Sequence, residues 1–406
     1  MTPASQIRNR IRFHADLIAL SWLGLGILPQ LSAGAAPAEP PRTSPLAIVT
    51  VDLNYQETDE VLAFSAVGVR LQTTAFRKEP PLGAKDAVRG FISGGPQPDI
   101  PFIWDKSRGR LYLDLNRNQD LSDDPEGVFV SASPATPVAN SAQSFTNVHL
   151  PIASGAAAHP AKLQLDFRYF QSGPLQVHAG LCSYWQARLI QGGGDWQFGI
   201  LEHLVGTAPA APPRLLLLRP WVERQRSVAP GAPDLFTFTN HIFFDGRAYD
   251  LSCRYDASPP AARYRVIFQE QTAPLGELTI SGTGLHRLVL TSNRGLTAIL
   301  DHPQGTLKLP VGIYSLDEIW LRDGKFEAAC FGGGTLTINE HRPAHLVAGG
   351  PLTNTVQLSS DREHLRLEYR LRSADRNFYQ LPRKNPPTFT IFHGTNRLAS
   401  DKFTFG

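Results

Sequence analysis

The sequence predicts an all-β protein built from several β-sandwich-like modules joined by short Pro/Ala-rich linkers. Two stretches, "KLQLDFRYF" at 162–170 and "HLRLEYRLR" at 364–372, alternate apolar and polar residues, and this period of two is typical of half-buried strands. Shorter runs such as "LAIVTVDLNY", "YRVIFQ" and "GELTISG" recur between Gly, Pro, Asn and Asp, as they do in β-sandwiches. Beyond the first 35 residues no stretch has a capped helical apolar stripe, which argues against parallel α/β folds.

The alternation also predicts which side chains are buried. One face of each strand should point into a core and the other should face solvent. The residues expected to be buried are Leu163, Leu165, Phe167, Leu365, Leu367 and Tyr369. The charged residues between them, including Asp166 and Arg366, are expected to be exposed.

Residues 1–35 have the composition of a secretory signal peptide. Arg8, Arg10 and Arg12 precede the apolar run "LIALSWLGLGILPQL", and small residues follow at 33–35. The run is about 15 residues long, short of the about 20 that a spanning helix needs, and an uncleaved anchor is the alternative. We therefore expect an exported protein of the periplasm or cell surface, with no membrane span in the mature chain.

Composition shifts indicate where modules begin and end. Pro/Ala-rich stretches occur at 36–45, 131–144, 206–214 and 256–263, and such stretches are typical of linkers. About 370 residues follow the leader, more than one core usually serves. The expected modules are an N-terminal β region at 36–140, a central β domain at 141–260, a sandwich at 261–340 and a C-terminal sandwich-like module at 341–406.

Charge and cysteine content narrow the functional classes. The net charge is +3, and loss of the leader would bring it closer to zero, so no basic footprint for nucleic acid is present. Cys182, Cys253 and Cys330 are an odd number of cysteines. They allow one disulfide with a spare thiol, or three small buried hydrophobic residues, and their pairing stays open.

The most distinctive stretch is the acidic loop "YLDLNRNQDLSDD" at 112–124. Counted from Asp114, oxygen-bearing side chains stand at positions 1, 3, 5 and 7, as in loops that converge alternate ligands on Ca²⁺. Ser122, Asp123 or Asp124 would close the site, because position 12 is Pro125 rather than a bidentate glutamate. The predicted metal ligands are Asp114, Asn116, Asn118, Asp120, Asp123 and Asp124, and the predicted ion is calcium.

One residue of the loop conflicts with the usual calcium pattern. Gln119 occupies the position that usually holds glycine, and a positive φ there would cost roughly 1 kcal/mol. The alternative to an ion site is a solvated turn in which Asx side chains hydrogen-bond to their own backbone. In either case β-like sequence on both sides, "LYLDL" and "GVFV", places the loop between two strands without a flanking helix.

Several segments resemble a group of uncharacterised exported bacterial proteins. The similar segments include "IPFIWDKSRGRLYLDLNRNQDLSDDPEGVF", "LLLLRPW", "AGGPLTNTV" and "PPTFTIFHGTNRLASDKFTFG", and together they cover nearly all of the chain after the leader. In those relatives the loop resembles "LYLDLNRNGDLTDD", with glycine in place of Gln119. Residues 305–324 also resemble prealbumin-like (carboxypeptidase regulatory-like) sandwiches, which implies that fold for 261–340.

Other chemically suggestive residues have ordinary interpretations. His341 and His345 stand four apart in "HRPAH", but Pro343 and the β-rich context remove the helix that would align them on a metal. His302 follows Asp301 and His241 precedes "FFDG", with no nucleophile motif near either. The local motifs of serine hydrolases and aspartic proteases are absent.

The aromatic and cysteine-containing stretches point mainly to packing. "LCSYWQARL" lacks the flanking glycine and second cysteine of a papain-like motif, so Cys182 is interpreted as a buried thiol. Five tryptophans could form a sugar-stacking platform, although core packing is the commoner use of tryptophan. They are Trp104, Trp185, Trp196, Trp221 and Trp320. In "RPWVERQR" an arginine stacked on Trp221 in a solvated loop is the favoured interpretation.

The expected function is structural, adhesive or binding, with a calcium-stabilised loop and a glycan or an envelope protein as partner. No catalytic motif is present. The alternatives are a carbohydrate-active or peptide-active hydrolase whose catalytic carboxylates are dispersed in sequence, which needs no local motif, and a glycan-binding module.

Overall fold

The structure is a computed structural model that describes most of the chain from residue 47 onward. The described residues are 47–83, 87–94, 97–132, 140–154, 157–170, 173–191, 193–202, 214–226, 228, 232–256, 263–360, 365–373, 377–381 and 386–404. The expected signal peptide and the expected linker at 36–45 lie outside these ranges, as does much of the other three expected linkers.

The described chain is all-β, which confirms the predicted fold class. Its regular elements are thirty strands and two short 3-10 turns, η1 (Pro125–Gly127) and η2 (Trp221–Glu223). None of the described segments forms a helix with the length and apolarity that a membrane crossing requires. The residues group into two compact units, one formed by Ala47–Ala273 with Arg294–Ala298, and the other by Pro274–Asn293 with Ile299–Gly406. We call them the N-terminal unit and the C-terminal unit.

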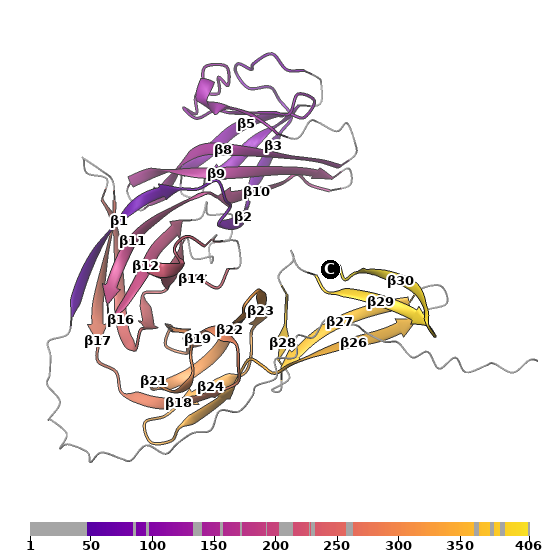
Figure 1. Ribbon diagram of the computed structural model, residues 1–406. Helices are drawn as coiled ribbons and strands as arrows, with labels where there is room; N and C mark the ends of the chain where they lie inside the picture. The colour runs from indigo at the N-terminus through magenta and orange to yellow at the C-terminus, as the bar shows by residue number, and fades with distance from the viewer. Residues whose placement is uncertain are drawn as a thin grey trace, which may run out of the picture. The chain divides into compact units, whose positions relative to one another are not determined.

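The N-terminal unit contains one long antiparallel sheet and two smaller ones (Figure 1). The long sheet runs in the order β14 (Leu235–Thr237), β13 (Arg214–Pro220), β12 (Gly194–Glu202), β11 (Ser183–Gln191), β1 (Ile48–Glu57), β17 (Arg263–Gln271), β16 (Arg247–Asp256) and β15 (His241–Phe244). The start of β20 (Leu296–Asp301) adds to β15 in parallel. The four-stranded sheet has the order β2 (Ala63–Val67), β10 (Gln176–Leu181), β9 (Ala157–Phe170) and β8 (Asn140–Ser154). The five-stranded sheet has the order β3 (Val69–Gln72), β4 (Val88–Gly94), β5 (Gln97–Asp105), β6 (Arg110–Leu113) and β7 (Val128–Val130).

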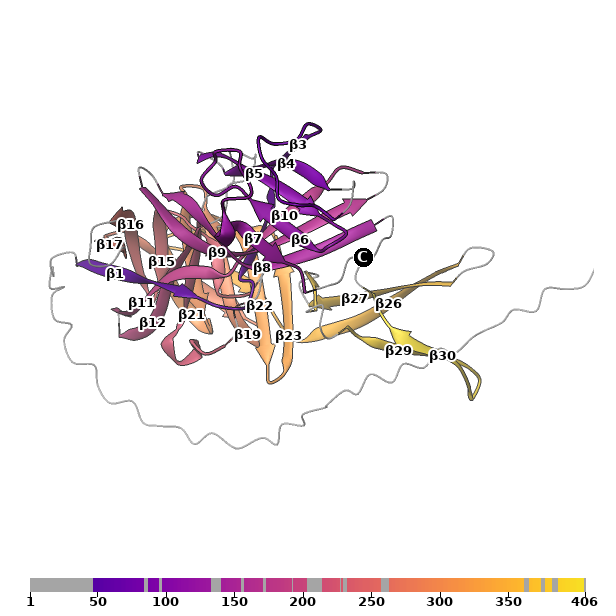
Figure 2. The ribbon, with the colours of Figure 1, turned by 90° about the horizontal axis from the view of Figure 1, so that it is seen from above.

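The two smaller sheets lie against each other and share one hydrophobic core (Figure 2). Phe167 of β9 is at its centre, with ring centroids 5.3 Å from those of both Phe102 and Trp104 of β5 and 5.8 Å from that of Phe145 of β8. Each such aromatic side chain contributes about 1.5–3 kcal/mol by leaving water. The buried Trp104 Nε1 donates to Gln143 Oε1 at 2.6 Å, which satisfies its polar atom. This packing is a β-sandwich.

The burial pattern of β9 confirms one part of the packing prediction and corrects another. Leu163, Leu165 and Phe167 are buried as predicted. Asp166 was predicted to be exposed and is only 8% exposed, so that part is wrong. The reason is that β9 lies between two strands, whose Ser144 and His178 flank the carboxylate, and Gln164 Nε2 donates to it at 3.0 Å. A buried polar group is tolerated when it has such a donor.

The C-terminal unit contains a group of strands around β22 and three small sheets. β22 (Gly312–Asp323) pairs with β19 (Leu285–Ser292), β23 (Phe326–Phe331) and β24 (Thr335–Ile338), while β18 (Leu275–Ser281) pairs with β21 (Gly305–Pro310) and in parallel with β25 (Ala344–Val347). The remaining strands are β26 (Leu352–Ser360), β27 (Leu365–Ser373) and β28 (Phe378–Tyr379), and a hairpin of β29 (Thr388–His393) with β30 (Asn396–Lys402). On β27 Arg366 is exposed as predicted, but Leu367 and Tyr369, which were predicted to be buried, are only half-buried, and the side chain of Leu365 lies outside the described residues.

Strand pairing crosses each of the three expected module boundaries. β2 pairs with β10 across residue 140, β1 pairs with β17 across residue 260, and β18 pairs with β25 across residue 340. The segments on either side of each boundary therefore share sheets, and the two units above describe the compactness of the chain better than four successive modules.

Candidate calcium loop

The acidic loop leaves the end of β6 and returns through η1 to β7. Strand pairing of β6 with β7 closes its base, so the loop lies between two strands as expected, with one 3-10 turn before the second. Leu121 fixes the middle of the loop, because its side chain is buried with Phe76, Ile103 and Tyr112 on one face of the five-stranded sheet. Two backbone hydrogen bonds with Lys78, at 3.2 and 3.1 Å, hold the chain on either side of Asp120.

Asp114 organises the first half of the loop. Its side chain is fully buried, Oδ1 accepts the backbone N–H of Asn118 at 3.2 Å and Oδ2 accepts that of Gln119 at 2.7 Å. Its own N–H donates to the Pro101 carbonyl at 3.0 Å. A buried carboxylate that accepts two backbone amides holds the turn around itself, as position 1 of a calcium loop must.

The two asparagines point their carboxamides at Asp123. Asn116 Nδ2 donates to Asp123 Oδ1 at 3.2 Å and Asn118 Nδ2 donates to Asp123 Oδ2 at 2.8 Å. Their oxygens accept backbone N–H groups, that of Asn118 at 3.0 Å and that of Asp120 at 2.6 Å. A cation between these side chains would need the carboxamide oxygens, so its binding requires the two carboxamides to rotate.

Asp124 is the electrostatically costly member of the loop. Burial, followed by the charges of Asp114 and Asp123, raises the pKa of its carboxyl group. Its Oδ2 is buried without a hydrogen-bond donor among the described residues. Asp124 and Asn116 also line an open hollow with Leu115, Pro125 and Glu126. An unsatisfied carboxylate oxygen beside two further carboxylates is an environment that a cation would stabilise.

Two features of the loop fit the predicted ligand set less well. The Asp120 carboxylate is engaged elsewhere, because Oδ1 accepts the N–H of Ser122 at 2.9 Å and Oδ2 pairs with Lys78 Nζ at 3.1 Å. In loops of this kind position 7 contributes its main-chain carbonyl, which does not depend on that side chain. Within the described chain, no three carboxylates of the loop bring one oxygen each within 4.8 Å of one another.

The backbone of the loop adopts left-handed conformations at two non-glycine residues. Arg117 has φ 62° and Gln119 has φ 65°. Gln119 therefore occupies the positive-φ turn that glycine normally supplies in calcium loops, and the strain expected from the sequence is present.

Replacing Gln119 with glycine is expected to stabilise the protein by about 0.5–1 kcal/mol. Glycine removes a left-handed strain of about 1–2 kcal/mol, and its greater freedom in the unfolded chain returns about 0.4–1 kcal/mol of that gain. Urea unfolding of the two proteins in EDTA measures the difference. Gln119→Ala is the control and is expected to leave stability unchanged, because alanine keeps the strain. Equal midpoints for all three proteins would contradict the strain.

Three other histidines singled out in the sequence, His241, His341 and His345, do not come together as a site in the described chain. His341 and His345 are both exposed, and His241 Nδ1 pairs with Asp250 at 2.6 Å on the surface. The three cysteines form no disulfide with one another. Cys182 is buried, and burial raises the pKa of its thiol. This agrees with a buried thiol rather than a nucleophile.

The tryptophans are used mainly for packing. Trp104, Trp185 and Trp196 are buried, so the core interpretation is confirmed for these three and a platform of all five is excluded. Trp221 is partly exposed, and the guanidinium of Arg224 lies 4.9 Å from its ring centroid. This confirms the expected arginine–tryptophan stack.

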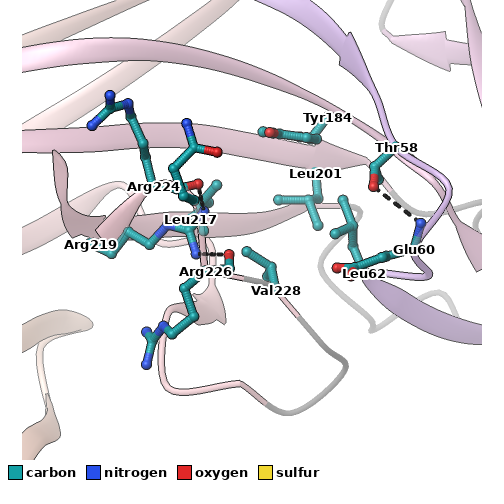
Figure 3. Close-up of a pocket in the computed structure, with 11 residues that line it drawn as sticks. Thr58, Glu60, Leu62, Tyr184, Leu201, Leu217, Arg219, Arg224, Arg226 and Val228 are labelled. Atoms are coloured by element: carbon teal, nitrogen blue, oxygen red, sulfur yellow. Dashed lines mark hydrogen bonds between the residues drawn. The ribbon is translucent and has the colours of Figure 1, made fainter. Parts of the chain in front are cut away.

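A pocket that the sequence did not reveal lies in the N-terminal unit (Figure 3). It has a volume of about 280 Å³, an apolar wall of Leu62, Leu201, Leu217 and Val228, and a polar rim that includes Tyr184 and three arginines. Burial raises the pKa of the Tyr184 hydroxyl, so this group is a hydrogen-bond donor at neutral pH. Glu60 is the only carboxylate among the lining residues. No local motif could have disclosed the pocket, because its residues come from four separate stretches of the chain.

Comparison with known proteins adds no family to these observations: no protein-family model, no curated protein and no solved structure matched this chain.

Proposed function

We propose that this chain is an exported, non-catalytic β-protein of the cell envelope with a structural, adhesive or binding role, whose loop at 114–124 is stabilised by a calcium ion. The carrying observation is the buried Oδ2 of Asp124, which has no hydrogen-bond donor among the described residues and lies close enough to Asp114 and Asp123 for their charges to raise the pKa of the carboxyl group. An ion there would be held by hard oxygen ligands, the type that Ca²⁺ prefers.

The geometry favours binding over hydrolysis. A glycosidase needs two carboxyl groups facing each other across its substrate. Among the residues that line the pocket in Figure 3, only Glu60 carries a carboxyl group. The same pocket, apolar on one side and polar at its rim, supports a glycan-binding role as the second candidate, since sugars present both kinds of surface. Its partner would then be a glycan of the envelope, whereas an adhesive role implies an envelope protein.

Calcium is expected to raise the melting temperature of the purified mature protein. With a Kd near 0.1 mM, typical of extracellular modules, about 2 mM calcium would stabilise the native state by roughly 1.8 kcal/mol through linkage. Calorimetric melts in excess EDTA and in calcium measure this shift, and magnesium is the matched ion, expected to act less because it demands a smaller, octahedral site. Identical melts in EDTA and in calcium, with no heat of binding at millimolar calcium, would leave the polar-turn interpretation in its place.

A further inference from the structure

Two histidines of the C-terminal unit meet where β19 and β20 lie side by side. His286 belongs to β19 and His302 follows the last residue of β20, and the His302 N–H donates to the His286 carbonyl at 2.8 Å. Their rings are nearly perpendicular, at 75°, with centroids 4.7 Å apart. His286 Nδ1 lies 3.2 Å from His302 Nε2. The two imidazole nitrogens therefore lie within hydrogen-bond distance of each other.

A carboxylate sets the tautomer of His302. Its Nδ1 lies 3.0 Å from Asp301 Oδ2, and the other oxygen of Asp301 accepts a hydrogen bond from the fully buried Arg287 at 2.7 Å. Because the carboxylate can only accept, the proton of the neutral imidazole is on Nδ1. The Nε2 lone pair then points toward His286. Metal-bound histidines are commonly oriented by such a carboxylate on the opposite ring nitrogen.

The backbone holds His302 in this place against its own preference. Its φ is 44°, a left-handed conformation that is uncommon for residues other than glycine, although histidine adopts it more often than most residues do. Pro303 follows directly, and a residue before proline favours extended conformations. Backbone strain of this kind persists where the surrounding structure enforces it, and it occurs frequently at functional sites.

We propose that His286 Nδ1 and His302 Nε2 bind a divalent transition-metal ion, zinc in the first place, with Asp301 as the residue that orients His302. Two nitrogens at about 2.0–2.1 Å from a tetrahedral zinc are about 3.4 Å apart, close to the 3.2 Å observed. His286 is buried whereas the His302 side chain is 54% exposed, so the ion is reached from the solvent side. Imidazole ligands select zinc, copper or nickel rather than calcium, which separates this site from the acidic loop.

The competing arrangement is an ordinary hydrogen bond in which His286 Nδ1–H donates to His302 Nε2. Both arrangements bring the two nitrogens to about this separation, and metal binding distinguishes them. The experiment is a calorimetric titration of the untagged mature protein with Zn²⁺, in millimolar calcium so that the acidic loop is already supplied with its preferred ion. One zinc site per chain is expected.

Variants assign the site to these residues. His302→Gln should weaken zinc binding at least tenfold. Asp301→Asn, which alters the group that orients His302 and also removes the negative charge opposite the buried Arg287, should weaken it about 10–100-fold. His345→Gln replaces an exposed histidine of the same unit and should bind zinc as the wild type does. Melts without zinc show whether each variant is folded. Equal zinc affinity for the wild type and a folded His302→Gln protein would overturn the proposal, as would loss of the site in His345→Gln.

A spectroscopic measurement on the wild type keeps the test independent of variant folding. Cu²⁺ prefers the same imidazole ligands and binds them more tightly than Zn²⁺. One equivalent of Cu²⁺ should give an electron paramagnetic resonance spectrum with hyperfine coupling to two imidazole nitrogens, and prior addition of excess Zn²⁺ should suppress it. A spectrum without nitrogen coupling would establish that the two rings are only hydrogen-bonded to each other.

Discussion

Replacing Arg219 with alanine is expected to destabilise the protein by about 3–5 kcal/mol, the largest effect of any single substitution considered. Arg219 is only 2% exposed. Its Nε donates to Gln197 at 2.6 Å, and its two terminal nitrogens donate to the carbonyls of Arg226 and Arg224, both at 2.7 Å. Removal of a buried charged partner leaves its acceptors unsatisfied, and such losses cost several kcal/mol.

Burial makes the charged form of Arg219 less favourable than it would be in water. Burial lowers the pKa of its guanidinium, and Asp234, which is fully buried and 3.5 Å away, partly offsets that effect. A lysine can place one ammonium group there but cannot span Gln197 and two carbonyls with a planar fork. Arg219→Lys should therefore recover less than half of the lost stability, although it restores the charge.

Urea unfolding followed by tryptophan fluorescence measures the loss, with Arg224→Ala as the matched control. Arg224 lies in the turn whose carbonyls bind Arg219, but its side chain is more exposed and stacks on Trp221. Its replacement should therefore lower the free energy of unfolding by about 1 kcal/mol or less. Similar losses for the Arg219 and Arg224 variants would mean that the hydrogen bonds of Arg219 to the turn carry little net stability.

The strands were predictable because their signal is local. Leu163, Leu165 and Phe167 alternate with polar residues, and a period of two reports a half-buried strand wherever the strand lies. Asp166 shows the limit of this signal. Whether the polar face meets solvent depends on the neighbouring strands β8 and β10, which supply Ser144 and His178, and no local pattern contains them.

The module boundaries and the pocket depend on pairing between distant segments. β1 lies between β11 and β17, more than a hundred residues away along the chain, so the Pro/Ala-rich stretches do not separate independent cores. The acidic loop is the opposite case, since all six predicted ligands fall within eleven residues. Its spacing identified Gln119 as the residue at the usual position of the sharp turn, where the structure has a positive φ, whereas the partner of Asp120, Lys78, lies in another loop.

Replacing Asp114 with alanine is expected to cost about 2–4 kcal/mol in EDTA and to abolish the stabilisation by calcium. The buried carboxylate accepts the N–H groups of Asn118 and Gln119, and a hydrogen bond to a charged group contributes about 1.5–3 kcal/mol. Without it both amides lose their acceptor and the turn that places the asparagines is free to open. The calcium site would lose a ligand and the geometry of two others at once.

The control for Asp114→Ala is Asp120→Asn, which changes a carboxylate of the same loop that does not accept the N–H groups of Asn118 and Gln119. The lost partner is Lys78, whose side chain is 64% exposed, and surface ion pairs contribute about 0–1 kcal/mol. Since the carbonyl of residue 120 is unchanged, the rise in melting temperature with calcium should persist in Asp120→Asn and vanish in Asp114→Ala. If Asp120→Asn removes the calcium effect as completely as Asp114→Ala does, the Asp120 carboxylate must leave Lys78 to bind the ion. A calcium effect that survives in Asp114→Ala would place the ion, if any, outside the loop.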